Sequence, residues 1–149
     1  MYRSILNTTL LAGTLDIVAA CLKAYFTSGT TPSHVLAYIA SGLLGKTANA
    51  GGTAIQVLGL TAHYLITLAC TICFYWAYPK WKILHISTIL NAFLICSVAW
   101  LVTTQLIVRF SHIGPQPILF NQAVIAFVIL LFCIGFPIAW RAQLYFKNK

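Results

Sequence analysis

Acidic side chains are almost absent from this 149-residue sequence: Asp16 is the only one, against nine lysines and arginines. Charged residues of both signs make up 7% of the chain, whereas apolar and aromatic residues make up 60%. A water-exposed surface on a chain of this size needs more charge than that. The composition excludes an ordinary water-soluble domain, and lipid is the expected solvent for most of the protein.

Several arrangements of catalytic residues are also missing. One aspartate cannot form the paired carboxylates of an aspartyl mechanism, and the sequence has no nucleophile elbow, Walker loop or Rossmann glycine pattern. The four histidines lie on different segments without an i, i+4 pair, so neither a metal nor another cofactor is expected. Cys70 and Cys73 match C-x-x-C, but in an apolar segment they are expected to act as small hydrophobes. We therefore expect a protein that is not an enzyme.

Long apolar segments dominate what is present. An α-helix needs about 20 apolar residues to cross the hydrocarbon core of a bilayer. Four segments reach this length, at residues 5–26, 53–78, 83–110 and 118–140. Because little chain remains outside them, residues 1–149 are predicted to form a single membrane domain. The predicted fold is an all-α integral membrane protein, a bundle of four transmembrane helices.

Local sequence signals add a short helix and a kink. Residues 32–44 are apolar but too few to cross the membrane. Thr31 suits the N-cap, Pro32 the first helical position and Gly45 the C-terminal end, which predicts an interfacial or re-entrant helix between the first two spans. Pro137 is expected to kink the last span.

The placement of positive charge predicts the orientation. Arg3, Lys80, Lys82, Arg141, Lys147 and Lys149 fall on one side of this topology, and Lys23, Lys46 and Arg109 on the other. Because cytoplasmic loops carry more lysine and arginine, both termini are predicted to be cytoplasmic. The first side also holds the aromatic residues Tyr2, Tyr75, Trp76, Tyr78, Trp81, Trp140 and Tyr145, as in an interfacial belt. The cations lie at helix ends rather than in a stripe, so nucleic acid is not an expected partner.

Three spans each carry one strongly polar group at middle depth. At about 1.5 Å per residue, Asp16 lies about 16 Å from the cytoplasmic side, His63 about 15 Å from the outer side and Asn91 about 12 Å from the cytoplasmic side. In a bundle these groups are predicted to converge. An ionisable group at this depth is a candidate for a protonatable functional site. The alternative is that the polar groups only tie the helices together, which for the uncharged Asn91 is the favoured interpretation.

The outer half of the bundle has a second polar set, made of Lys23, Gln56, Gln105 and Arg109. Its cations favour an anion or an acidic headgroup. We expect a small transport or channel-like protein, and an oligomer because four spans enclose little volume. The alternative is a non-catalytic accessory subunit, assembly factor or lipid-binding scaffold of a larger membrane complex. In both cases membrane lipid is a partner.

Four short motifs carry a family resemblance. They are Gly13-Thr14-Leu15-Asp16, Ala40-Ser41-Gly42-Leu43-Leu44-Gly45, Gly51-Gly52, and Leu58-Gly59-Leu60 followed by His63. Together they resemble a group of small uncharacterised bacterial inner-membrane proteins of about this length. The resemblance covers mostly the first half of the chain. It implies a four-helix protein of the bacterial inner membrane and no particular substrate, cofactor or reaction.

Overall fold

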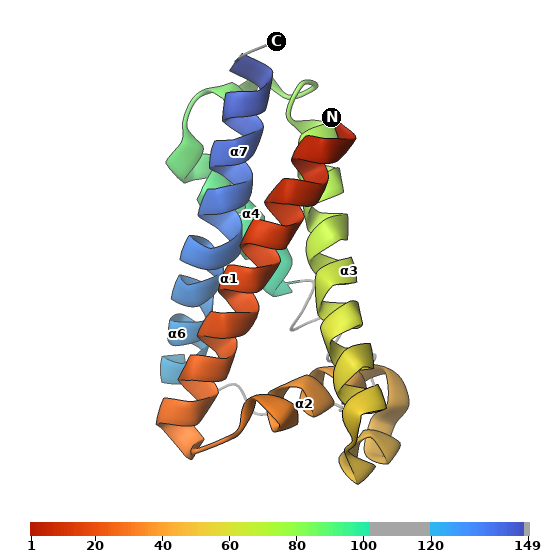
Figure 1. Cartoon of the computed structure of the whole chain (residues 1–149). Coiled ribbons are helices and arrows are strands. Elements are labelled where there is room, and N and C mark those ends of the chain that lie inside the picture. The colour runs from red at the N-terminus through yellow and green to blue at the C-terminus, as the bar shows by residue number, and fades with distance from the viewer. Residues whose placement is uncertain (102–119, 148–149) are drawn as a thin grey trace.

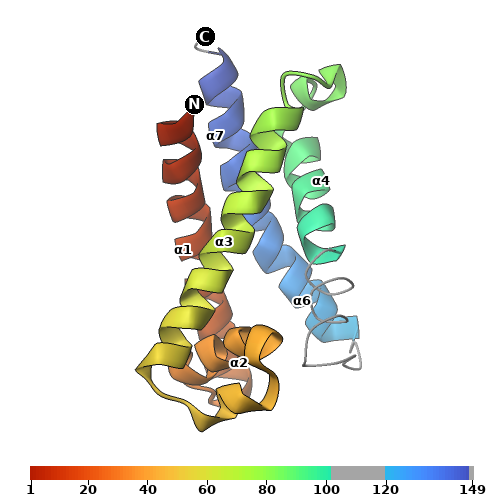
Figure 2. The same cartoon turned by 90° about the vertical axis from the view of Figure 1, so that its right-hand side faces the viewer.

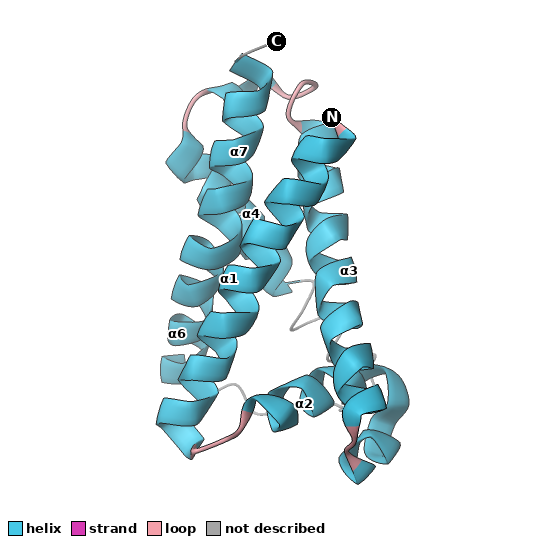
Figure 3. Ribbon diagram, in the orientation of Figure 1, coloured by secondary structure: helices cyan, strands magenta, loops and turns pink. Residues whose placement is uncertain are grey.

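The computed structural model describes residues 1–101 and 120–147, and within these ranges the chain is helical without strands. The elements in chain order are α1 (Tyr2–Ser28), α2 (Pro32–Leu44), η1 (Gly45–Ala50), α3 (Thr53–Ala77), η2 (Lys82–His85), α4 (Thr88–Leu101), α6 (Phe120–Leu130), η4 (Leu131–Gly135) and α7 (Phe136–Lys147). η1 and η2 are 3-10 helices, and η4 is a π-helical turn. Figure 1 and Figure 3 show an all-α bundle.

Three helices in the described ranges are long and apolar enough to cross a membrane. They are α1 with 27 residues, α3 with 25 residues, and the continuous run of α6, η4 and α7 with 28 residues. α4 is apolar but only 14 residues long. It belongs to the predicted span 83–110, whose residues after 101 lie outside the described part of the chain.

The two ends of the bundle differ in what they contain. The start of α1, the end of α7 and the connection between α3 and α4 gather at one end, here called the termini end (Figures 1 and 2). α2 lies across the opposite end, the α2 end, and packs against α3. α1 packs against α3 and also against η4 and α7, so it links the two halves of the bundle.

α2 occupies the same residues as the short helix predicted from Thr31, Pro32 and Gly45. Thr31 has the extended backbone of an N-cap residue, and Gly45 ends the helix with φ 63°. After η1, Gly51 and Gly52 turn the chain into α3 with φ of 69° and 105°, a conformation that side chains disfavour. The two glycines therefore permit α2 to fold back against α3.

The third predicted span begins later than the sequence indicated. A helix was expected from Ile83, but Lys82–His85 form the 3-10 helix η2, and α4 begins at Thr88. Ser87 caps α4, since its Oγ accepts a backbone N–H from the first turn at 3.5 Å. A hydroxyl residue immediately before an apolar run is the signal that marks this boundary.

The last helix extends beyond its predicted range of 118–140. It continues to Lys147, and it adopts π geometry over η4, just before Pro137. Proline cannot donate a hydrogen bond to the carbonyl four residues earlier, and the π turn accommodates this loss. Gly135 of η4 lies so close to α4 that a Cβ there would overlap the carbonyl of Ala92. η4 and α4 are thus in close backbone contact.

Aromatic residues form the core at the termini end. Tyr75 and Tyr78 of the α3 C-terminus are only 1% and 5% exposed. The Tyr78 ring stacks on Phe146 of α7 with centroids 5.1 Å apart, and Tyr75 contacts the ring of Tyr145. These two tyrosines are core residues, not members of the interfacial belt expected from the sequence, because α7 continues past residue 140 and covers them.

Large apolar side chains cover the outside of the bundle. On α1 alone, Leu11, Leu15, Val18 and Leu22 are each 41–52% exposed. A soluble monomer rarely leaves such an extended apolar surface in contact with water. Hydrocarbon solvates this surface without penalty. The apolar exterior and the length and hydropathy of α1, α3 and the last helix therefore both indicate a membrane protein.

The position of α2 depends on Gly59 of α3. A Cβ at this position would overlap the carbonyl of Leu36 and lie 3.3 Å from the backbone N of Ala40. Ala40 is itself fully buried. Small residues at such a crossing let the two backbones approach closely, which strengthens packing where lipid supplies no hydrophobic driving force.

Gly59→Ala is expected to displace α2 and lower the midpoint of thermal unfolding in detergent. On helix propensity alone the change would stabilise α3 by about 1 kcal/mol, so the sign of the shift isolates the steric effect. Leu60→Ala, on the more exposed face of the same helix, is the control and should change the midpoint little. A higher midpoint for Gly59→Ala would contradict the close approach of α2.

Candidate functional site

Three hydroxyl groups join α1 and α3 near the termini end. Tyr75 Oη lies 3.1 Å from Ser4 Oγ and 3.0 Å from Thr8 Oγ1, and Thr8 donates to the carbonyl of Ser4 at 2.8 Å. Each hydroxyl has one proton to donate. Because that of Thr8 is directed to a carbonyl, Tyr75 donates to Thr8, and Ser4 donates to Tyr75. Every hydroxyl proton in this group is therefore used.

His63 continues the contact between α1 and α3 toward the α2 end. Its Nε2 lies 2.9 Å from the carbonyl of Gly13. A carbonyl only accepts, so Nε2 carries a proton, and Nδ1 is the nitrogen that a second proton would occupy. Beside it, Tyr64 Oη lies 2.8 Å from Thr14 Oγ1. A Cβ at Gly13 would be 2.7 Å from the Tyr64 ring, so a side chain there would displace the ring.

Asp16 lies one turn after Gly13 on α1 and is half-buried. The described residues form no hydrogen bond to its carboxyl group, and His63 lies within electrostatic range of it. The same carboxyl group acts electrostatically on Cys96 of α4 and Cys133 of η4. Asp16 thus lies within electrostatic range of groups on α3, α4 and η4, and it forms no ion pair with any described residue.

Asn91 does not join Asp16 and His63. Its side-chain amide donates to the carbonyl of Leu84 and ties η2 to α4. Because α4 begins at Thr88, Asn91 lies in the first turn of the helix. In the predicted span 83–110 it would have followed two helical turns. Its Oδ1 is buried without a hydrogen-bond partner among the described residues. The convergence of Asp16, His63 and Asn91 therefore stays a prediction: His63 lies within electrostatic range of Asp16, and Asn91 is bonded elsewhere.

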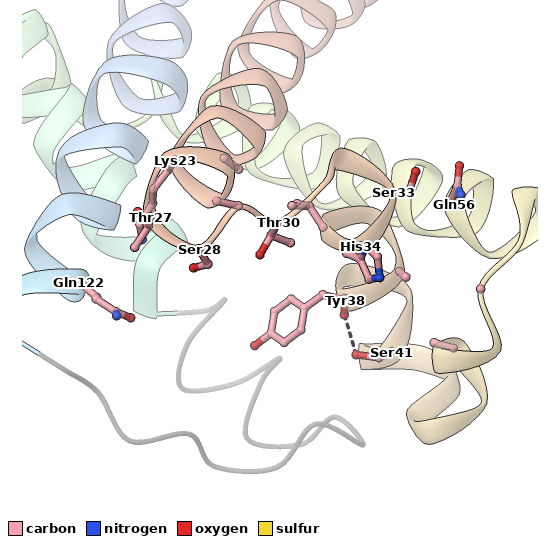
Figure 4. A pocket seen from close by; sticks show the side chains of 16 residues that line it. Lys23, Thr27, Ser28, Thr30, Ser33, His34, Tyr38, Ser41, Gln56 and Gln122 are labelled. Carbon is pink, nitrogen blue, oxygen red and sulfur yellow. Dashed lines mark hydrogen bonds between the residues drawn. The ribbon is translucent and has the colours of Figure 1, made fainter.

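A cleft of about 840 Å³ opens at the α2 end (Figure 4). Its walls come from the last turns of α1, from α2, from the start of α3 and from the start of α6. Lys23 and Gln56, two of the four residues predicted to line the outer half, both belong to it. Gln105 and Arg109, the other two, lie outside the described residues.

The cleft offers hydrogen-bond donors and no carboxylate. Its polar lining consists of Lys23, Thr27, Ser28, Thr30, Ser33, His34, Tyr38, Ser41, Gln56 and Gln122. His34 is held by Thr31, whose Oγ1 lies 2.7 Å from Nδ1. Because Lys23 is cationic and Asp16 is the only acidic side chain of the sequence, the electrostatic potential of this lining favours negative charge.

Sequence reasoning missed most of these polar residues. Serine, threonine, tyrosine and histidine recur from Thr27 to Ser41, which is the compositional signal for the cleft. It also missed the three hydrogen-bonded hydroxyls of Ser4, Thr8 and Tyr75 between α1 and α3. The i, i+4 spacing of Ser4 and Thr8, which places both on one face of α1, is the signal that could have indicated them. Tyr75 was assigned to an interfacial belt, and neither Tyr75 nor Tyr64 has a local pattern that indicates its partner on α1.

Comparison of the chain with protein-family models, with curated proteins and with solved structures gives no match.

Tyr75→Phe is expected to weaken the α1–α3 contact because it removes the hydroxyl between Ser4 and Thr8. Hydrogen bonds between membrane helices contribute about 0.6 to 1.7 kcal/mol, so a measurable loss of thermal stability in detergent should follow. Tyr64→Phe is the matched control, since Tyr64 is only half-buried and has one hydroxyl partner. Equal losses for both variants would argue against a special role of the Tyr75 hydroxyl.

Proposed function

We propose that this chain is a small transport or channel-like membrane protein that works as an oligomer. Asp16 and His63 form its protonatable site, and the cleft at the α2 end admits an anionic solute or an acidic headgroup. A carboxylate and an imidazole within electrostatic range of each other affect each other's protonation, and histidine titrates closest to neutral pH. Such a pair at middle depth is suited to proton-coupled movement of a solute.

The observation that carries this proposal is that the cleft lining reaches to within one turn of Asp16 along the same face of α1. Ala20 lines the cleft and lies one turn after Asp16. Lys23, also in the cleft, is seven residues from Asp16, or about 10 Å along the helix. Small side chains at Ala20 and Ala24 leave room along this face. The path from the cleft to the carboxyl group is therefore short.

The sign of the charge supports an anion as the ligand. Asp16 interacts with His63 and with no lysine or arginine of the described chain. The ammonium group of Lys23 thus lacks a carboxylate partner among the described residues, and a bound anion would supply one. An oligomer is proposed because the helices of one copy enclose too little volume for a continuous path.

The topology proposed for this function has four spans in a bacterial inner membrane, with α4 as the described part of the third span. Both termini face the cytoplasm, and the cleft faces the outside. The larger number of lysines and arginines at the termini end supports this orientation. Exposed leucine and valine on α1 support contact with lipid or with a second copy.

Asp16→Asn is expected to abolish proton flux in liposomes that contain the purified protein and a trapped pH-sensitive dye. The amide has the shape of the carboxyl group but does not titrate. Lys23→Gln should retain the protonatable pair and lose the dependence of flux on external chloride, phosphate or sulfate. Thr61→Val, on the exposed face of α3, is the control and should behave as the parent does.

Equal flux in the parent and in Asp16→Asn, or no flux above empty liposomes, would count against transport. If Asp16→Asn then lowered only the thermal stability, and a larger protein co-purified with the native chain, the polar pair would be structural. The chain would then be an accessory subunit or scaffold.

Cysteine labelling tests the orientation in whole bacterial cells. In a variant without its five native cysteines, Thr47→Cys in η1 should react with a membrane-impermeant maleimide from outside. Lys80→Cys at the termini end should react only after the membrane is permeabilised. The reverse pattern would invert the topology, and labelling of both residues in intact cells would argue against it.

A further inference from the structure

A second cavity, of about 460 Å³, lies at the termini end between the first turns of α1 and the last turns of α3. It is here called the α1–α3 groove. Leu6, Leu68, Ile72 and Trp76 form much of its wall, and Phe146 of α7 also lines it. Leu6, Ile72 and Trp76 are 46–66% exposed, so the groove opens to the outside of the bundle.

The dimensions of the groove match one leaflet of a bilayer. From Leu68 to the end of α3 at Ala77 the helix rises about 14 Å, and half of a 30 Å hydrocarbon core is about 15 Å. Apart from the cation of Lys80 at one end, the wall is made of apolar and aromatic side chains. A groove of this length, with an apolar wall, suits an extended acyl chain.

The mouth of the groove carries positive charge. Lys80 follows the last turn of α3, and its Nζ lies 3.2 Å from the centre of the Trp76 ring. The ring holds the ammonium group without neutralising it. Asp16 is the only acidic side chain of the sequence and lies in the middle of α1, so no side chain at this end provides a counter-charge. A headgroup phosphate would complete the site.

We propose that the α1–α3 groove binds an anionic phospholipid, with one acyl chain along Leu68 and Ile72 and the phosphate at Lys80. Charge complementarity and the one-leaflet depth favour this occupant over a second copy of the chain, whose corresponding end is equally basic. The site uses neither Asp16 nor the cleft at the α2 end. Its existence is therefore independent of the proposed transport function.

Thermal unfolding of the purified chain in detergent, with added phosphatidylglycerol or phosphatidylcholine of identical acyl chains, tests the site. Phosphatidylglycerol is expected to raise the midpoint more, and native mass spectrometry should show it bound. Lys80→Gln should weaken phosphatidylglycerol binding roughly five-fold, since a cation near an anionic lipid contributes about 1 kcal/mol. Lys82→Gln, the nearby control outside the groove, should change binding much less.

Filling the groove gives a second, independent measurement. Ile72→Trp replaces a wall residue by a larger side chain that fills the groove, and it should displace both lipids. Leu65→Trp, on an exposed part of α3 outside the groove, should not. Equal stabilisation by both lipids, or equal effects of Lys80→Gln and Lys82→Gln, would overturn the proposal. So would a disulfide-linked dimer of Ile72→Cys in native membranes, made in the variant without the five native cysteines, which would show a second copy in the groove.

Discussion

In hydrocarbon a polar side chain finds no water, and each buried donor or acceptor has to be satisfied by another part of the protein. The contact between α1 and α3 meets this constraint over much of its length. Tyr75, Ser4 and Thr8 share hydroxyl protons at one level, and the His63 ring donates to the Gly13 carbonyl at another. Once α1 and α3 are joined in this way, His63 comes within electrostatic range of Asp16, and the cleft and the groove form at the two ends of the same helix pair.

The scarcity of acidic residues gives both ends of the bundle a similar chemistry. Lys23 in the cleft and Lys80 at the groove have no carboxylate partner in the described chain. Both of our proposals therefore assign the counter-charge at each end to an anion from outside the protein. The two sites differ in their walls, because the cleft is lined by hydroxyl and amide groups and the groove by hydrocarbon. The first suits a polar anion, and the second suits an acyl chain with a charged headgroup.

Periodicity and local signals predicted much of the fold but not its exact boundaries. Proline at position 32 and glycine at position 45 predicted α2 over the residues it occupies, since these two residues have strong local conformational preferences. The start of α4 was wrong by five residues, because Ile83 and Leu84 are apolar and hydropathy alone does not distinguish a 3-10 helix from the first turn of a span. The predicted depth of Asn91 was counted from that earlier start, whereas the structure places Asn91 near the beginning of α4, bonded to the carbonyl of Leu84.

The sequence by itself indicated a lipid environment and long helices apolar enough to cross a membrane, and it predicted one carboxylate and one imidazole at middle depth, since composition and segment length carry this information locally. Only the tertiary structure decided which faces meet. Gly59 has no side chain, so the backbone of Leu36 can approach it closely and α2 can lie across the bundle. The extension of α7 to Lys147 buries Tyr75 and Tyr78. These contacts join residues from different helices, and the spacing of residues along one helix does not specify its partner.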